Sequence, residues 1–191
     1  MTRDRIAAIV EQQIALLDPY LLSQEKVLGE LTRQLVTNFH QGGRLFLAGS
    51  GPFGTIASLL GQTFIHRQTI ERPALPTIAL TNDPGLATFL AADNQSHQFF
   101  SRQLRALATD RDTLLVLAGT ELSAADREVL ETAEQLGCRT ALICSAHAAP
   151  AKMVPELQLQ LPSDSAPRLL ESVLSIGNLL CALVEAELFG I

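Results

Sequence analysis

The sequence predicts a three-layer, doubly wound α/β fold, with a five-stranded parallel sheet and an N-terminal helical arm. Short apolar runs alternate with segments whose apolar residues recur at helical spacing. The runs are apolar through most of their length, which is typical of parallel strands covered on both faces. Hydrophobic residues make up 47% of the 191 residues and aromatic ones only 5%. The core should therefore consist mainly of aliphatic side chains, as when helices cover a sheet.

Two helices are predicted ahead of the first strand, at residues 3–17 and 21–38, and they form an arm over residues 1–40. Their apolar residues, among them Ile6, Ile9 and Ile14, lie at helical spacing. A pair of helices with one apolar stripe cannot bury that stripe without a partner. We expect the arm to pack on the domain formed by residues 41–191 or to serve oligomerisation.

Five strands are predicted in the domain, at residues 44–48, 77–80, 113–118, 139–144 and 156–161. Helices are predicted at residues 54–66, 96–107, 123–136 and 166–189. In doubly wound sheets, ligands bind beyond the carboxyl ends of the strands, near a topological switch point. The turns that follow Ala48, Leu80, Ala118 and Cys144 are therefore the places where a site is expected.

Composition excludes several classes of function. The net charge of -6 and the pI near 5.2 argue against direct nucleic-acid binding, which depends on Lys and Arg contacts to phosphate. Cys138, Cys144 and Cys181 form no CxxC motif and are interpreted as reduced core thiols. The N-terminus is amphipathic and charged, and no apolar run reaches about 18 residues without a charge. We expect a cytoplasmic protein with no membrane contact.

The first turn lies within "LFLAGSGPFGTIASLL", residues 45–60, and has features of an anion site. Gly49 and Gly51 allow a close approach of the backbone, Ser50 offers a hydroxyl, and the following helix presents its positive end. Together with Gly54 the glycines also read G-x-G-x-x-G. However, the nearest acidic residue after the next strand, Asp83, comes about 30 positions later, whereas a dinucleotide site has one after about 20. Dinucleotide binding is therefore disfavoured.

The turn after the third strand, within "LLVLAGTELSAADREVL", allows two interpretations. Thr120 and Ser123 could form a second anion-binding turn. Alternatively, Ser123 is the N-cap of an ordinary helix, with Asp126 three residues later completing a capping box. Glu121 favours the second interpretation, because a carboxylate in the turn repels a phosphate.

The histidines do not predict a metal site or a cofactor. His40, His66, His97 and His147 lie on different segments, without a further ligand at metal spacing. His97 follows Asp93, and the pair could line the rim of a pocket or form a solvated helix start. Neither Ser50 nor Ser145 has a paired base in the sequence, so a hydrolase triad is not indicated.

With these turns, the N-terminal helical pair and the long last helix, the sequence resembles the sugar isomerase (SIS) domain in its small single-domain form. That group includes the phosphoheptose isomerases and the DnaA-associating DiaA proteins. The stretches "ERPALPTIAL", "RQLRALATDRDTLLVL" and "LLCALVEAELF" (residues 71–80, 102–117 and 179–189) are most similar to DiaA. The resemblance implies a flavodoxin-like SIS fold and a homotetramer.

The resemblance also implies where catalysis would occur. Phosphoheptose isomerases are expected to interconvert sedoheptulose 7-phosphate and a heptose phosphate with a Glu and a His as acid and base, and some bind zinc there. The matching positions hold, in this sequence, Leu59, Thr63, Leu170 and Asn178. None of these is a base near neutral pH or a good zinc ligand. We therefore expect no catalytic residue and no metal.

The phosphate-binding positions of the family are altered as well. Its S-T-S-G-N-S pattern corresponds to residues 118–123, where Glu121 replaces the glycine, and Phe53 replaces a serine in the first turn. A phosphate needs donors, which these changes remove. What the resemblance leaves is a vestigial sugar-phosphate pocket, which we expect to contain Ser50, Gly51, Phe53, Asp93, Thr120, Glu121, Ser123 and Asn178.

The C-terminus carries Leu188 and Phe189. From the residues alone, such a pair indicates helix packing or an oligomer contact. The resemblance implies that it contacts the amino-terminal domain of DnaA. The sequence thus leads to the hypothesis of a non-catalytic, DiaA-like homotetramer that binds DnaA. The alternative is a phosphoheptose isomerase-like protein that binds a sugar phosphate, either as a divergent sedoheptulose 7-phosphate isomerase or as a sensor.

Overall fold

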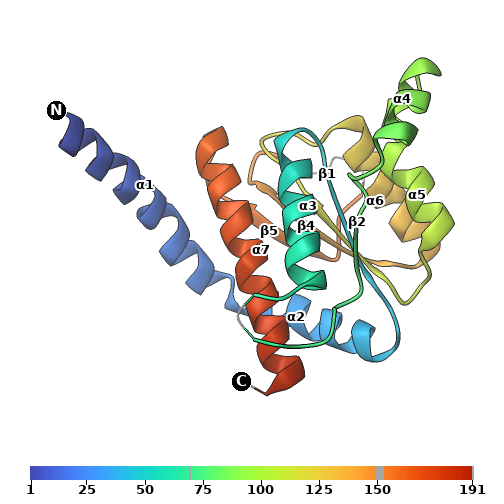
Figure 1. The fold of residues 1–191 in the computed structure, drawn as a ribbon. Helices are drawn as coiled ribbons and strands as arrows, with labels where there is room; N and C mark the ends of the chain where they lie inside the picture. Colours follow the sequence, from blue (N-terminus) through green and yellow to red (C-terminus); the bar gives the residue numbers. More distant parts are fainter. Residues whose placement is uncertain (69, 149–152, 191) are drawn as a thin grey trace.

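The computed structural model describes residues 1–68, 70–148 and 153–190, and its centre is one parallel sheet (Figure 1). The order of the strands is β2-β1-β3-β4-β5, and every neighbouring pair is parallel. The chain leaves β1 toward β2 on one side and returns to β3 on the other. This reversal creates a switch point between the carboxyl ends of β1 and β3. The strands are β1 Leu45–Gly49, β2 Thr77–Ala79, β3 Thr113–Leu117, β4 Arg139–Ser145 and β5 Leu157–Leu161.

Helices cover both faces of this sheet, which confirms the predicted fold class. They are α1 Thr2–Ser23, α2 Glu25–His40, α3 Pro52–Ile65, α4 Pro84–Ala92, η1 Ser96–Gln98, α5 Phe99–Leu107, α6 Ala124–Leu136 and α7 Ala166–Phe189. The pleat of β1 and β3 explains the three layers, because successive side chains point to opposite faces. Leu45 and Leu47 belong to the core under α2, α3 and α7, whereas Phe46 belongs to the core under α5 and α6.

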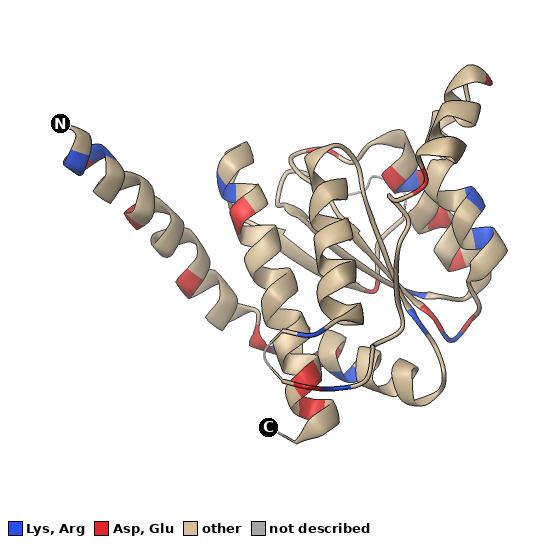
Figure 2. Ribbon diagram, viewed as in Figure 1, with Lys and Arg blue, Asp and Glu red and all other residues tan. Residues whose placement is uncertain are grey.

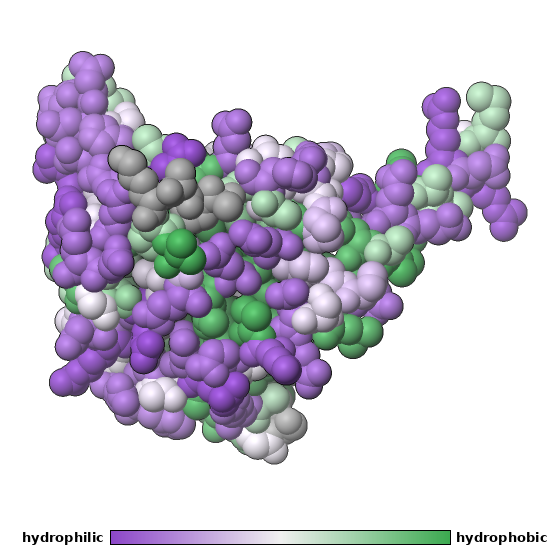
Figure 3. Space-filling view, turned by 180° about the vertical axis from the view of Figure 1, so that it is seen from behind, coloured by the Kyte–Doolittle hydropathy of each residue, from purple (hydrophilic) through white to green (hydrophobic). Residues whose placement is uncertain are grey.

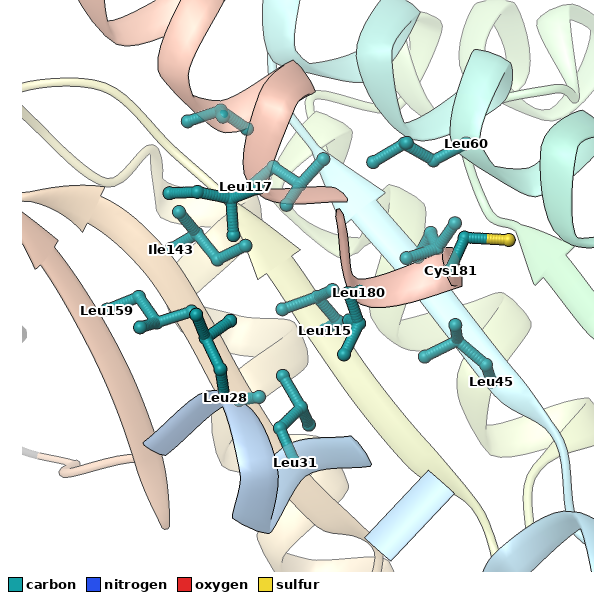
Figure 4. Packing of buried hydrophobic residues seen from close by; sticks show 14 of the residues in the cluster. Leu28, Leu31, Leu45, Leu60, Leu115, Leu117, Ile143, Leu159, Leu180 and Cys181 are labelled. Carbon is teal, nitrogen blue, oxygen red and sulfur yellow. The ribbon is translucent and has the colours of Figure 1, made fainter. Parts of the chain in front are cut away.

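The core on the α7 face is built almost entirely from aliphatic side chains, as the composition predicts. Figure 4 shows Leu115 of β3 beside Leu180 of α7, and Leu159 of β5 beside Leu28 of α2. The helices approach so closely that a methyl group added at Gly177 would lie 2.2 Å from Leu60 Cδ1. The face is completed by Leu28, Leu31 and Leu35 of α2, which are at most 4% exposed.

The two helices of residues 1–40 differ in their surroundings. α2 packs within the core, whereas α1 projects from the body in Figure 1 with its first ten residues exposed. Ile6, Ile9 and Ile14 on α1 are each at least 51% exposed. Seen from behind, apolar surface surrounds the point where the arm leaves the body (Figure 3). α1 also continues through Pro19 to Ser23, although the prediction ended it at residue 17.

One element was not predicted at all. α4 begins at Pro84, directly after the sequence Asn82-Asp83 that resembles a turn. Asp83 is its N-cap, with the carboxylate accepting a hydrogen bond from the backbone of Leu86, and proline is favourable at the first helical position. The Pro-Gly pair at 84–85 therefore starts a helix instead of forming a loop.

Among the residues described, α7 alone is long and apolar enough to cross a membrane. Half of its most apolar window is buried inside the protein, so it is the central core helix of this face. It also carries Glu185, which is buried and bound to Arg72 at 2.7 Å. The Arg72 guanidinium donates further to the carbonyls of Phe64 and Pro73, and the ion pair fastens the α3–β2 connection to α7.

Candidate functional site

A cleft of about 520 Å³ opens at the switch point, and we call it the α3–α5 cleft. Its hydroxyl-rich side is formed by Ser50, Thr55, Ser58 and Thr81, and Phe99 and Phe100 of α5 contribute aromatic rings next to Ser96. The described residues that line it are all uncharged. Figure 2 shows the same neutrality for α3, which carries no Lys, Arg, Asp or Glu.

The β1–α3 turn forms the floor of this cleft, and its glycines have different structural roles. Gly51 adopts φ 58° and ψ -131°, a conformation that is open only to glycine without strain. Gly49 and Gly54 lie close to backbone instead: a methyl group on Gly54 would lie 2.7 Å from the Gly49 carbonyl oxygen. The G-x-G-x-x-G spacing is thus explained by a tight strand-to-helix turn, without a nucleotide.

A second, smaller cavity of about 250 Å³ lies beside the β3–α6 turn, and we call it the β3–α6 cavity. Ser50 and Ser123 line it, together with Phe53, Thr120, Glu121 and Asp126. The ring of Phe53 covers Gly119, because a methyl group there would lie 2.9 Å from the Phe53 Cε2 atom. The aromatic ring that replaces the family's serine is therefore part of the wall.

Three side chains from two turns form a hydrogen-bonded network in this cavity. Ser50 Oγ donates to Asp126 Oδ1 at 2.9 Å and lies 2.7 Å from Ser123 Oγ. The backbone N–H of Ser123 donates to Asp126 Oδ2 at 2.9 Å, and the N–H of Asp126 donates to Ser123 Oγ at 3.1 Å. The capping box predicted from the sequence is confirmed, and Ser50 from the first turn is bound to it.

Asp126 is only 2% exposed. Loss of hydration raises the pKa of its carboxyl above the ordinary value, and the hydrogen bonds from Ser123 and Ser50 lower the pKa again in part. The Asp126 carboxylate is thus buried at the positive end of α6, where hydrogen bonds replace only part of the hydration that it has lost.

The hydroxyl-rich side of the α3–α5 cleft is organised by a second network. Ser58 Oγ lies 2.8 Å from Thr81 Oγ1 and 2.5 Å from Asn82 Oδ1. Ser58 comes from α3 and Thr81 from the segment between β2 and α4, so the network joins α3 to that segment. Hydroxyl groups fixed in this way can donate to or accept from the hydroxyls of a sugar.

The predicted pocket residues do not all meet. Ser50 lines both cavities, Gly51 lines the α3–α5 cleft, and Phe53, Thr120, Glu121 and Ser123 line the β3–α6 cavity. Asp93 instead ends α4 and is exposed. Asn178 lies on α7, where its carbonyl oxygen accepts from Gln68 at 3.0 Å. His97 lies on η1, 3.7 Å from Glu128.

The four positions matched to the family's acid, base and metal ligands have other contacts here. Leu59 is 46% exposed, and the Thr63 hydroxyl donates to the Leu59 carbonyl within α3. Leu170 packs against the core on the α7 face. Within the described ranges 1–68, 70–148 and 153–190, no three His, Cys, Asp or Glu side chains lie together as metal ligands.

Sequence reasoning missed part of the cleft. Thr55 and Ser58 follow the first turn at positions 4 and 7 after Gly51 on α3, a helical spacing that could have placed them on the same side. Thr81 and Asn82 lie two and three residues beyond the end of β2, at the same edge of the sheet as Ser50 after β1. Nothing in the sequence indicated that Asp126 also binds the Ser50 hydroxyl, because the two residues lie 76 positions apart.

The C-terminal pair is divided between core and surface. Leu188 is partly buried and packs against the core on the α7 face, and Phe189 is 37% exposed. Leu188 is therefore accounted for by intramolecular packing.

No protein-family model matches the chain. Its relatives nevertheless extend over its whole length: it is 31% identical over 186 residues to the phosphoheptose isomerase of Trichlorobacter lovleyi, covering 97% of this chain and 95% of the relative. Among solved structures it resembles a phosphoheptose isomerase from Francisella tularensis, with a TM-score of 0.87 and 24% identity over 96% of this chain and 98% of the other. The isomerase GmhA from Neisseria gonorrhoeae matches with a TM-score of 0.84 and 18% identity, over 97% and 100%. At these identities the structures show a shared fold.

These matches correct the leading hypothesis drawn from the sequence. The expectation of a DiaA-like protein that binds DnaA through Leu188 and Phe189 is wrong, because relatives that span the chain are phosphoheptose isomerases and the matching folds include GmhA. The alternative, a phosphoheptose isomerase-like protein, fits better. The chain belongs to the phosphoheptose isomerase family of SIS-domain proteins.

Proposed function

We propose that the protein binds a phosphorylated sugar in the α3–α5 cleft. The observation that carries the proposal is the mixed lining of this cleft at the switch point: Ser50, Thr55 and Ser58 line it together with the aromatic residues Phe99 and Phe100. A sugar has hydroxyl edges and apolar C–H faces, which match such a lining. Membership of a sugar-phosphate isomerase family supports the same ligand class.

The phosphoryl group of this ligand belongs, in our proposal, at the β1–α3 turn. The N-terminus of α3 supplies a positive dipole end there, and Gly51 lets the backbone turn toward the ligand. Among the described lining residues there is no Lys or Arg, so the phosphoryl group would be held by dipole and hydroxyl contacts. We expect an affinity that falls only modestly with added salt.

Isomerisation of the bound sugar phosphate is a second candidate, and the 31% identity to a phosphoheptose isomerase favours it. Proton transfer between adjacent sugar carbons needs a general base within reach. The family's positions carry Leu59, Thr63, Leu170 and Asn178, so a reaction would have to use other groups. Conversion of sedoheptulose 7-phosphate, followed by sugar chromatography, separates an isomerase from a sensor.

Thr55→Glu tests the proposed binding site directly. Thr55 is exposed on the first turn of α3 and lines the cleft, so a carboxylate there would repel a phosphoryl group. We expect the affinity for sedoheptulose 7-phosphate, measured by isothermal titration calorimetry, to fall at least tenfold. The fold should persist, because an acidic residue near the start of a helix is favourable.

Gln62→Glu is the matched control, because it adds the same charge to the exposed side of the same helix, outside the cleft lining. It should bind as the wild type does. Binding that is unchanged in Thr55→Glu, or a wild type to which neither sedoheptulose 7-phosphate nor another sugar phosphate binds, would overturn the proposal.

We also infer that the protein is a homo-oligomer in the cytoplasm, with a tetramer as the expected state. The exposed side chains of Ile6, Ile9, Val10 and Ile14 on α1 support the inference, because apolar patches of this kind on soluble proteins mark interaction surfaces. Multi-angle light scattering of the wild type and of a chain with Ile6 and Ile14 changed to Ser provides the test. A monomeric wild type would contradict it.

A further inference from the structure

We propose that Asp126 is a specificity-determining residue: its carboxylate takes the place of a phosphoryl group in the β3–α6 cavity and keeps phosphoryl groups of ligands out of it. This inference deepens the proposed function and rests on it. It assigns the phosphoryl end of the sugar to the β1–α3 turn and leaves the β3–α6 cavity to uncharged parts of a ligand.

The hydrogen-bond geometry carries the first step. The Ser50 hydroxyl donates to Asp126 Oδ1, and the Ser123 N–H donates to Asp126 Oδ2. Since the hydrogen of Ser50 is used for Asp126, the short contact between the hydroxyls requires Ser123 to donate to Ser50. The Asp126 N–H in turn donates to Ser123. The network is therefore a closed ring in which both hydroxyl hydrogens are already used.

The consequence for a ligand follows from what phosphate needs. A phosphoryl group has only acceptor oxygens, so it is held by N–H and O–H donors. At the β3–α6 turn, the donors of Ser50 and Ser123 are committed to Asp126 and to each other. A phosphoryl group would have to break this ring and also lie beside a negative charge.

Charge and burial strengthen the exclusion. Asp126 is 2% exposed, so water screens its charge poorly. Glu121, which lines the same cavity, adds a second carboxylate. Arg127 is the neighbouring cation on α6, but it is exposed. Phe53 occupies part of the wall, and the described residues that line the cavity include no Lys or Arg, so nothing in the lining offsets the two carboxylates for an anion.

The test replaces Asp126 by an isosteric, neutral side chain. In Asp126→Asn the amide oxygen can still accept from the Ser123 N–H. The amide N–H₂ can donate to Ser50 Oγ, which frees the hydroxyl hydrogen of Ser50 to bind an anion. We expect inorganic phosphate and sulfate to bind at least tenfold more tightly than to the wild type, measured by calorimetry on the full chain. Asp126→Ser, which also removes the charge, should shift affinity in the same direction.

Two further variants make the result specific. Asp110→Asn removes one charge from an exposed position between α5 and β3, at the opposite edge of the sheet, and should bind phosphate as the wild type does. The double variant Thr55→Glu with Asp126→Asn blocks the α3–α5 cleft but should keep the gain, because that gain arises in the β3–α6 cavity.

Each outcome separates this inference from the proposed function. If sedoheptulose 7-phosphate fails to bind the wild type but Asp126→Asn still gains phosphate affinity, the proposed function fails and the anion-excluding role of Asp126 stands. If Asp126→Asn and Asp126→Ser both fold, by circular dichroism, and bind phosphate no better than the wild type, the inference is overturned. A gain that disappears in the double variant would also overturn it, since it would place the phosphate in the other cleft.

Discussion

The β1–α3 and β3–α6 turns lie side by side at the carboxyl edge of the sheet, and both contain glycine and a hydroxyl residue. They differ in charge, because the first is uncharged and the second carries a buried carboxylate. In the first, a glycine with positive φ opens the start of α3 onto a cleft lined by uncharged residues. In the second, the start of α6 is capped by Ser123 and by the carboxylate of Asp126. A glycine and serine turn before a helix therefore does not predict an anion site by itself, because the chain can supply its own carboxylate at the helix start, as Asp126 does in α6.

Gly51→Ala should disturb the first turn most. No atom lies within 4 Å of the added methyl group, so its cost comes from backbone strain at φ 58°, about 1–3 kcal/mol. We expect the free energy of unfolding, from urea denaturation, to fall by that amount and the binding of sedoheptulose 7-phosphate to be lost.

Gly29→Ala is the matched control for this change. Gly29 also has no neighbour within 4 Å of an added methyl group, but it lies inside α2. There alanine should stabilise the chain by about 0.5–1 kcal/mol. Equal stability changes in the two variants would show that the Gly51 conformation is not required.

Phe53→Ser tests what closes the second turn. The variant restores a small hydroxyl where the ring now covers Gly119. Loss of a half-buried aromatic side chain should lower the free energy of unfolding by about 1–2 kcal/mol. Alone it should gain little affinity for sulfate, because Asp126 remains, and together with Asp126→Asn the gain should exceed that of Asp126→Asn alone.

A cycle of the two single variants and the double variant measures this coupling. Sulfate is the suitable ligand, because its charge is constant across the accessible pH range. A large gain in Phe53→Ser alone would show that the ring, and not the carboxylate, excludes anions.

The smallest effect concerns pH. Burial raises the pKa of Asp126 in the folded protein, so the folded chain holds this proton more tightly than the unfolded chain does. The contribution of this group to stability is complete below its unfolded pKa and is lost as the pH rises through its folded pKa. The stability of Asp126→Asn relative to the wild type should therefore increase as the pH rises from about 3 toward neutral. Urea titrations at several pH values measure it, and a relative stability that falls over this range would contradict the prediction.

Much of the fold could be predicted from the sequence, because it depends on patterns within single segments. The five apolar runs gave the strands to within two residues at each end, and Ser123 with Asp126 three residues later gave the capping box. α4 was missed because Asp83 and Pro84 serve equally as turn residues and as a helix start, and only tertiary contacts decide between the two.

The site was less predictable, because its members come from separate turns. Ser50, Gly51 and Ser123 were expected at the same edge and do meet there, since the ends of parallel strands share one edge. Asp93 and Asn178 rested on family positions alone and lie outside both cavities. The hypothesis built on Leu188 and Phe189 failed because a pair of common apolar residues at a helix end is explained equally well by packing.

The most direct test of the proposed binding site is a crystal structure of the wild type with sedoheptulose 7-phosphate bound. We expect electron density for the sugar between α3 and the Phe99–Phe100 pair, with the phosphoryl group at the start of α3 and the hydrogen-bonded ring of Ser50, Ser123 and Asp126 intact. A phosphoryl group bound at Thr120–Ser123, with that ring opened, would contradict it.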